Sequence, residues 1–171
     1  DPLLTAGIDA LHSASLPLLI SGECTGTMTL TEPQAGSDLA LVRARAAPLN
    51  DGRYKVFGTK IFITYGEHDM AANIVHLVLA RAQGAPEGIK GISLFLVPKF
   101  LPRDDGGVGP RNGVSCAGIE HKMGIKASAT CQINFDESQG WLVGAPHKGM
   151  QAMIAMMNSE RLGVGMQGLG I

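Results

Sequence analysis

The sequence predicts a mainly β fold of barrel or sandwich type in a single domain. Short runs rich in Thr, Val and Ile fill residues 25–143, and turn-forming residues such as Asn50-Asp51-Gly52 separate them. No helical patterns alternate with these runs, which argues against a parallel sheet covered by helices. The length of 171 residues fits one domain with a sizeable core.

The strands follow one another with short connections. The segment Asn50-Asp51-Gly52 predicts a hairpin, because Asn and Gly tolerate the positive φ angles that tight hairpin turns require. The other boundaries come from Gly66, from the glycine-rich segment 84–88 and from the turn at 104–109. The strands expected from these patterns span residues 27–30, 41–47, 54–57, 60–64, 74–81, 92–98 and 128–135.

Helical patterns precede and follow the strands. Before them, apolar residues recur at helical spacing at Leu3, Leu4, Ile8 and Leu11. We interpret residues 1–22 as the end of a helix, in which Pro17 follows the helical pattern and restricts the chain to extended or turn geometry. The chain starts at Asp1 without a signal-peptide pattern, which suggests a trimmed N-terminus.

A second helical pattern begins after Gly149. Its residues recur at spacings of three and four, and they are Met150, Met153, Ile154, Met157, Arg161 and Val164. No charged or capping stop signal follows before Ile171, so we expect the chain to be part of a larger protein.

The glycines at 163, 165 and 168 match the dinucleotide-binding pattern G-x-G-x-x-G. That fingerprint requires a strand before the first glycine and a helix N-terminus after it, whereas here a Met-rich helix pattern leads into it. We therefore interpret these glycines as small residues for close helix packing.

Composition excludes several classes of protein. The formal net charge of −1 gives no bulk attraction to nucleic acid or to an anionic membrane. Cys24, Cys116 and Cys131 are widely spaced, so neither a disulfide framework nor a zinc site is indicated. No apolar stretch approaches the ~18 residues of a membrane span. We expect a cytoplasmic protein without metal, nucleic-acid partner or membrane span.

One segment has the composition of an anion-binding turn. A strand leads into Thr31-Glu32-Pro33-Gln34-Ala35-Gly36-Ser37-Asp38, where nothing bulky blocks the backbone amides around Gly36 and Ser37. The Ser37 hydroxyl adds a donor. Such a turn could cradle a phosphate, although a Pro-Gly turn capped by Ser and Asp has the same composition.

Together with later motifs, this segment resembles the acyl-CoA dehydrogenase family. The family's T-E-P-x-A-G-S-D and N-G-x-K-x-[WF]-I-T motifs correspond to residues 31–38 and 51–64. Further matches are the buried strand 91–98, the L-G-x-x-x-S-x-T strand at 122–130, Phe135-Asp136, Leu142-Val143-Gly144, Gly149-Met150 and Arg161. The resemblance covers nearly the whole chain.

The resemblance implies the middle-domain β-barrel or orthogonal sandwich of an acyl-CoA dehydrogenase. Residues 1–22 would end the N-terminal helical domain, residues 23–146 would form the middle β domain, and residues 147–171 would begin the C-terminal helical domain. The complete protein would be a homodimer or homotetramer that oxidises an acyl-CoA to the trans-2-enoyl-CoA. It would pass a hydride to FAD and then electrons to an electron-transfer flavoprotein or a similar acceptor. This fragment alone would be inactive.

The resemblance also implies which residues bind the ligands. The FAD contacts carried over from the motifs are Met28, Leu30, Thr31, Gly36, Ser37, Phe62, Ile63 and Thr64. Ser37, Asn158 and Arg161 would contact the acyl-CoA, with Asn158 in place of the family's usual Asp. No catalytic residue is expected, because the family's glutamate base lies beyond residue 171.

The segments Tyr65-Gly66-Glu67-His68-Asp69 and Ile119-Glu120-His121-Lys122 resemble the larger bacterial branch that includes methylmercaptopropionyl-CoA dehydrogenases. Two other functions stay open. One is a flavin-binding relative of the alkylation-response type, which contacts DNA, although no basic stripe supports it. The other is a β scaffold that is inert in isolation.

Overall fold

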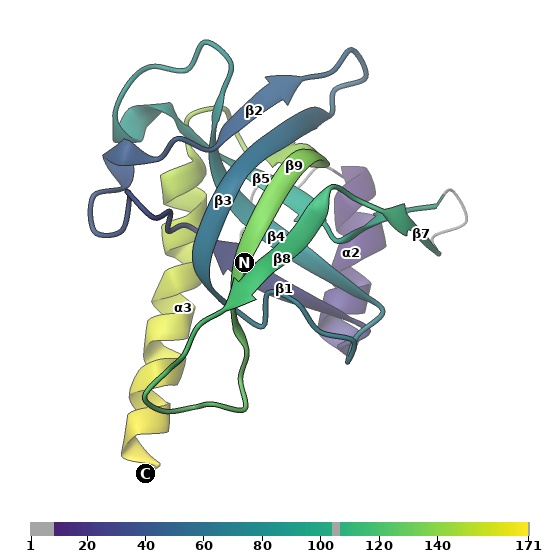
Figure 1. The fold of residues 1–171 in the computed structure, drawn as a ribbon. Coiled ribbons are helices and arrows are strands. Elements are labelled where there is room, and N and C mark those ends of the chain that lie inside the picture. The colour runs from purple at the N-terminus through teal and green to yellow at the C-terminus, as the bar shows by residue number, and fades with distance from the viewer. Residues whose placement is uncertain (1–8, 104–106, 171) are drawn as a thin grey trace.

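The computed structural model describes residues 9–103 and 107–170. Figure 1 shows a strongly curved sheet with a helix from each end of the chain packed beside it, α2 (Asp9–Ser21) and α3 (Gly149–Leu169). Leu3, Leu4 and Ile8 of the predicted first helix lie outside the described residues.

Most of the chain between the helices forms strands. They are β1 (Cys24–Thr29), β2 (Arg45–Pro48), β3 (Tyr54–Thr64), β4 (Asn73–Ala82), β5 (Ile92–Pro98), β6 (Phe100–Pro102), β7 (Val108–Arg111), β8 (Val114–Ile119) and β9 (Thr130–Val143). Two single turns of 3₁₀ helix, Leu39–Leu41 and Ile89–Gly91, lie between them.

The main sheet returns on itself. β4 pairs with β2, β2 with β3, β3 with β9 and β9 with β5, and β5 also pairs with β4. β8 adds to β9, and β6 and β7 form a separate ribbon. The prediction of a mainly β, barrel-like fold is confirmed.

β1 and β2 both run parallel to β4, a pairing that the sequence did not lead us to expect. β1 lies beside Asn73–Val78, and β2 lies beside Arg81 and Ala82. Because β5 covers the other edge of β4, β1 and β2 share one edge. The chain leaves this edge after Thr29 and returns to it at Arg45, so residues 30–44 form a loop outside the sheet.

The core lies between β4, β5 and the strands that close the sheet. The side chains of β5 are buried from end to end, and those of β4 are buried from Ile74 to Ala80. Strands buried on both faces read as continuous apolar runs, which is why the bounds of β5 agree with the prediction and those of β4 differ by one residue at each end.

The hairpin at Asn50-Asp51-Gly52 is confirmed. β2 and β3 pair in antiparallel fashion across it, Gly52 has a φ of +82°, and the amide of Leu49 donates to the carbonyl of Arg53 at 2.8 Å. The two strands expected at 54–57 and 60–64 are the single strand β3, whose register with β9 shifts between Val56 and Gly58 because β9 has an extra residue there. The strand expected at 41–47 starts later, at Arg45, because Leu41 belongs to the 3₁₀ turn and residues 42–44 form no strand.

The prediction that Pro17 ends the first helix is wrong. Pro17 lies inside α2, which continues to Ser21 and is followed by Gly22 with a φ of +82°. The φ of proline suits a helix, and its ring removes only one backbone hydrogen bond. Glycine in the left-handed region is the more usual helix terminator.

The second helix is confirmed. α3 starts tightly against β5, since a Cβ at Gly149 would lie 2.4 Å from the carbonyl carbon of Ser93, and Met153 is fully buried. Gly163, Gly165 and Gly168 lie inside α3, so no nucleotide fingerprint exists there. The packing expected at these glycines is not seen, because no other described element lies within 4 Å of their Cβ positions.

Candidate site on the loop between β1 and β2

The loop of residues 30–44 opens with a tight turn. The backbones of Glu32 and Ala35 exchange two hydrogen bonds of 3.0 Å, and the Ala35 side chain is buried. Asp38 then caps the short helical turn by accepting from the amide of Ala40 at 2.9 Å. Gly36 and Ser37 are exposed between these two fixed points.

Gly36 and Ser37 present polar groups that the chain leaves unused. Within residues 9–103 and 107–170, no protein group accepts a hydrogen bond from either amide or from the Ser37 hydroxyl. A Cβ built on Gly36 meets nothing within 4 Å, so the space above this glycine is open. Adjacent free amides with open space above them can receive an anion.

β3 ends in a strained bulge that exposes an aromatic ring. The register with β9 shifts between Lys60 and Ile63, and Phe62 in this bulge has a φ of +61°. A left-handed backbone is rare for a bulky residue, and such strain concentrates at functional sites. The Phe62 side chain is 59 % exposed, Thr64 is exposed, and Ile63 between them is buried in the core. Any contact of Ile63 with a ligand would therefore come from its main chain.

The start of the loop lies beside this bulge. The carbonyl of Thr31 accepts from the amide of Ile61 at 2.9 Å. Met28 and Leu30 are half-buried and pack against the core at the end of β1. The structure thus brings Thr31 next to the bulge that carries Phe62, although these residues are far apart in the sequence.

Asn158 and Arg161 lie on α3, away from the core. Both are exposed, and the Arg161 guanidinium donates to the Asn158 side-chain oxygen at 3.2 Å. In the described chain these two residues contact one another, and no hydrogen bond links them to the loop of residues 30–44.

Sequence reasoning missed an ion pair behind the loop. Lys60 on β3 and Glu32 in the loop are 0 % and 3 % exposed, and the lysine Nζ lies 2.9 Å from Glu32 Oε1. The same Nζ donates to the carbonyl of Leu30 at 2.9 Å. The Glu32 carboxylate also accepts from the amides of Arg43 and Ala44, at 2.8 and 3.0 Å.

Burial and pairing shift both pKa values. Burial lowers the pKa of Lys60, and the neighbouring carboxylate opposes that shift. Burial alone would raise the pKa of Glu32, but Lys60 and the amides of Arg43 and Ala44 together lower it below its usual value. A buried pair with its other hydrogen bonds satisfied is the only arrangement in which such charges are tolerated.

The alternation of inward and outward side chains along β3 could have indicated that Lys60 is buried. Val56 and Lys60 are both even positions of one strand, and side chains two residues apart share a face. If Val56 faces the core, Lys60 must face it too and needs an acidic partner. The bulge after Lys60 then changes the parity, which explains why Ile63 is buried as well.

Arg81 on β4 holds the loop from another side. Its guanidinium donates to the carbonyls of Ala40 and Val42 at 2.6 and 2.8 Å, and to those of Gly88 and Pro86 at 2.8 and 3.2 Å. It therefore ties the loop of residues 30–44 to the connection between β4 and β5.

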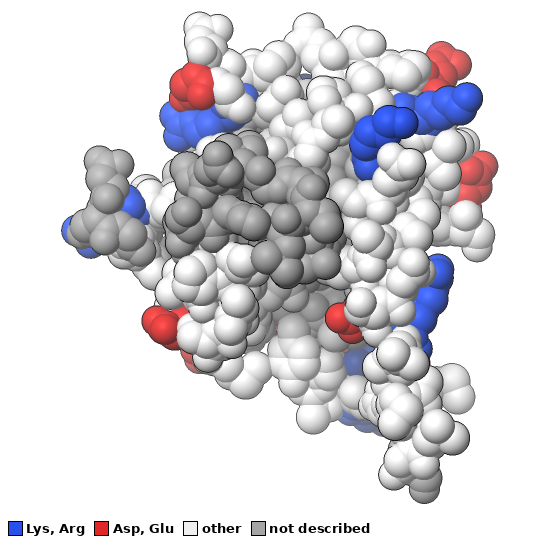
Figure 2. All heavy atoms as spheres, turned by 180° about the vertical axis from the view of Figure 1, so that it is seen from behind, with Lys and Arg blue, Asp and Glu red and all other residues white. Residues whose placement is uncertain are grey.

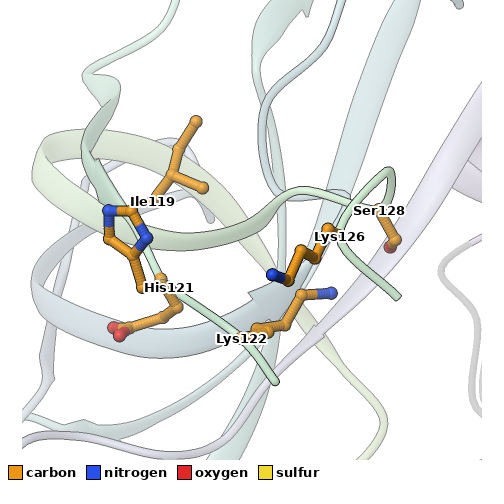
Figure 3. A pocket seen from close by; sticks show the side chains of 6 residues that line it. Ile119, His121, Lys122, Lys126 and Ser128 are labelled. Carbon is orange, nitrogen blue, oxygen red and sulfur yellow. The ribbon is translucent and has the colours of Figure 1, made fainter. Parts of the chain in front are cut away.

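A shallow cavity of about 280 Å³ lies elsewhere, in the connection between β8 and β9. Figure 3 shows that its side chains come from both arms of this connection, His121 and Lys122 from the first and Lys126 and Ser128 from the second. None of the residues predicted to bind a ligand lines it.

Three further properties of the described residues concern metal ligands, membrane helices and surface charge. No cluster of His, Cys, Asp and Glu within residues 9–103 and 107–170 could hold a metal ion. None of the described helices combines the length and apolarity needed to cross a membrane. On the face in Figure 2, charged side chains of both signs are scattered, without a continuous band of Lys and Arg.

Comparison with known proteins shows the family of the chain. The family model "Acyl-CoA dehydrogenase, middle domain" matches residues 27–138. The chain is 52 % identical to 3-methylmercaptopropionyl-CoA dehydrogenase of Ruegeria pomeroyi over its whole length, which is 29 % of that protein.

Two solved structures have the same fold. The butyryl-CoA dehydrogenase of Megasphaera elsdenii superposes with a TM-score of 0.80 at 28 % identity, over 99 % of this chain and 41 % of that one. An acyl-CoA dehydrogenase from Bacillus anthracis, solved in complex with FAD, gives 0.71 at 29 % identity, over 92 % of this chain and 24 % of that one. The chain thus spans less than half of each of these three proteins. From its matched family model and its fold, the chain belongs to the acyl-CoA dehydrogenase family, and residues 27–138 match the middle domain.

Proposed function

We propose that this chain is the flavin-binding middle part of an acyl-CoA dehydrogenase that oxidises an acyl-CoA thioester to its trans-2-enoyl-CoA. The observation that carries the proposal is that the structure has two features with groups free to contact a ligand. One is the turn with free amides at Gly36 and Ser37, and the other is the strained bulge with the exposed Phe62.

These surfaces fit the two chemically different parts of FAD. The unused amides and the open space at Gly36 suit the pyrophosphate. Phe62 and Thr64 suit an isoalloxazine ring, because an exposed aromatic side chain gains by covering a flat apolar surface. Thr31, held beside the bulge by its bond to Ile61, would donate to the polar edge of the ring.

When bound, FAD would accept the hydride from the β carbon of the acyl group. The part of this chain is to orient the ligands and exclude water. Met28, Leu30 and Phe62 would pack against the ring, Ser37 would lie near the pantetheine arm, and Asn158 and Arg161 would contact the CoA portion.

We assign no proton transfer to this chain. Glu32 has its carboxylate occupied by Lys60 and by two amides, and Asp38 caps a helical turn. The base that removes the α proton would come from the rest of the complete protein. Electrons would leave to an electron-transfer flavoprotein or a similar acceptor, and the complete protein would be a homodimer or homotetramer.

The test is anaerobic titration of the complete, FAD-loaded protein with acyl-CoA thioesters. We expect flavin absorbance to be lost on adding 3-methylmercaptopropionyl-CoA or butyryl-CoA, with the enoyl-CoA as the product found by mass spectrometry. The first of these is the preferred substrate if the similarity to the Ruegeria pomeroyi protein extends to the acyl pocket.

Other outcomes would favour the alternatives. A protein that binds FAD and duplex DNA but is not reduced by any acyl-CoA would be a flavin-binding relative of the alkylation-response type. A complete protein that binds neither FAD nor acyl-CoA would leave this chain as a structural β scaffold.

A further inference from the structure

We infer that the buried pair Lys60–Glu32 is a positioning device that sets the turn carrying Gly36 and Ser37 in register with the bulge carrying Phe62. The inference rests on the proposed function, since it assigns these residues a role toward FAD. Neither residue would touch the cofactor.

The first step of the argument is where the pair stands. Lys60 lies two residues before Phe62 on β3, and Glu32 lies four residues before Gly36 in the loop. The lysine Nζ bonds both the Glu32 carboxylate and the carbonyl of Leu30. One side chain therefore joins the strand of the bulge to the start of the turn.

The second step is what else the carboxylate holds. Glu32 accepts from the amides of Arg43 and Ala44, at the far end of the same loop, and from Gln34 Nε2 at 2.5 Å. The beginning and the end of the loop thus meet at one carboxylate. The turn at Gly36 and Ser37 projects from this closed base, which fixes its direction without engaging its amides.

The third step is the close contact that this closure requires. Gly58 on β3 has a φ of +140°, and a Cβ there would lie 2.8 Å from that of Ala44. The loop end therefore lies directly against β3. Arg81 holds the carbonyls of Ala40 and Val42 from the other side. Glu32 and Arg81 thus hold the segment 40–44 by side-chain hydrogen bonds, and the buried Val42 and Ala44 pack into the core.

Energetics argue that the pair does more than stabilise the fold. A buried ion pair is weak evidence for stability, because the cost of desolvating both charges offsets their attraction and apolar replacements are often as stable. What it provides is geometry, because each charged group must keep its hydrogen-bond partners in place.

The test uses the complete protein with FAD removed. Lys60→Met removes the charge and its two bonds, and the double variant Glu32→Gln with Lys60→Met leaves no buried charge at this position. Lys55→Met is the matched control, because Lys55 lies on the same strand and pairs with Glu137, but that pair is exposed.

The readouts are the Kd for FAD, from quenching of flavin fluorescence, and the thermal midpoint of the apo-protein. We expect Lys60→Met to weaken FAD binding at least tenfold and Lys55→Met to change it less than twofold. The double variant should regain the apo-protein midpoint of the wild type and still bind FAD at least tenfold more weakly.

A double variant with a wild-type midpoint and a wild-type Kd would overturn the inference, because the pair would then serve folding alone. If both Lys60 variants fail to fold, the inference is tested by Gln34→Leu, a substitution of an exposed residue. It removes one bond to the carboxylate and should weaken FAD binding two- to fivefold, whereas an unchanged Kd overturns the inference. A wild-type protein that binds no FAD overturns the proposed function itself.

Discussion

His76 is a buried neutral base whose protonation opposes folding. Its ring is 0 % exposed, Nδ1 lies 2.7 Å from the Thr27 hydroxyl, and burial lowers its pKa from 6.5 to about 3. In the unfolded chain the ring takes up a proton below pH 6.5. The stability that this residue contributes is therefore complete above pH 6.5 and is lost as the pH falls from 6.5 toward 3.

We expect the wild type to lose about 1.4 kcal/mol more than His76→Asn when the pH is lowered from 7.5 to 5.5, since one unfavourable proton uptake costs this amount per pH unit. Asn keeps a polar partner for Thr27 but does not titrate. Denaturant unfolding at the two pH values measures the difference. Equal losses in both proteins would show that folding does not lower the pKa of His76.

At Gly36, one substitution should weaken FAD binding and leave the stability of the fold nearly unchanged. The φ of Gly36 is not in the left-handed region and a Cβ there has open space, so Gly36→Ala should change the free energy of unfolding by less than about 0.5 kcal/mol. The added methyl would stand where we place the pyrophosphate. FAD binding should weaken roughly tenfold, the value of about one charge-assisted hydrogen bond.

Gly118→Ala is the control for this prediction. Gly118 lies on β8, its Cβ would be 4.0 Å from the Gln132 side chain, and it is not among the predicted site residues. Fluorescence titration with FAD and thermal unfolding should find this variant unchanged in both. If Gly118→Ala lost as much FAD binding as Gly36→Ala, the turn at Gly36 and Ser37 could not be assigned to the pyrophosphate.

At the scale of elements, the first half of α3 holds the helix to the sheet. Met153 is fully buried against the core, whereas Ile154, one residue later, is 41 % exposed. Met153→Ala should destabilise the protein by about 2–5 kcal/mol, because it removes buried methylenes and leaves a cavity.

Ile154→Ala is the matched comparison and should cost less than about 1 kcal/mol in denaturant unfolding. Similar losses for both variants would mean that the other face of α3 is covered in the complete protein. The exposed Leu162, Val164, Met166 and Leu169 farther along α3 make that covering the natural alternative.

The elements differ in how far local sequence determines them. β5 has the predicted bounds because a strand buried on both faces is apolar throughout. β6, β7 and β8 were not predicted, since Val108-Gly109-Pro110-Arg111 contains no run of β-formers and depends on pairing with β6. The prediction at Pro17 was wrong because the φ of proline suits a helix and its ring removes only one backbone hydrogen bond.

For the candidate site, the sequence predicted residues that would face a ligand, but it did not predict the ion pair that holds the loop in place. Gly36 and Phe62 were predicted as FAD contacts from motifs in the sequence, whereas the left-handed backbone and the exposed ring of Phe62 are findings of the structure. The contact of Glu32 with Lys60 joins residues 28 positions apart, and only the closed sheet brings them together. Alternation on β3 could have placed Lys60 inside, but it could not have named the partner.

For the whole molecule, the parallel pairing of β1 with β4 has a consequence for the order of folding. Thr27 and His76 are partners across 49 residues, whereas Arg81 and Ile92 pair across a short connection between β4 and β5. Closing the longer connection costs more chain entropy, and distant pairings form late. We expect β1 to join after β4 and β5 have paired, so that pulsed hydrogen exchange protects the amides of 92–98 before those of 24–29. Simultaneous protection would contradict this order.

If β1 joins late, the loop of residues 30–44 that follows it also closes late. A newly made chain would then form its barrel before it could hold a ligand.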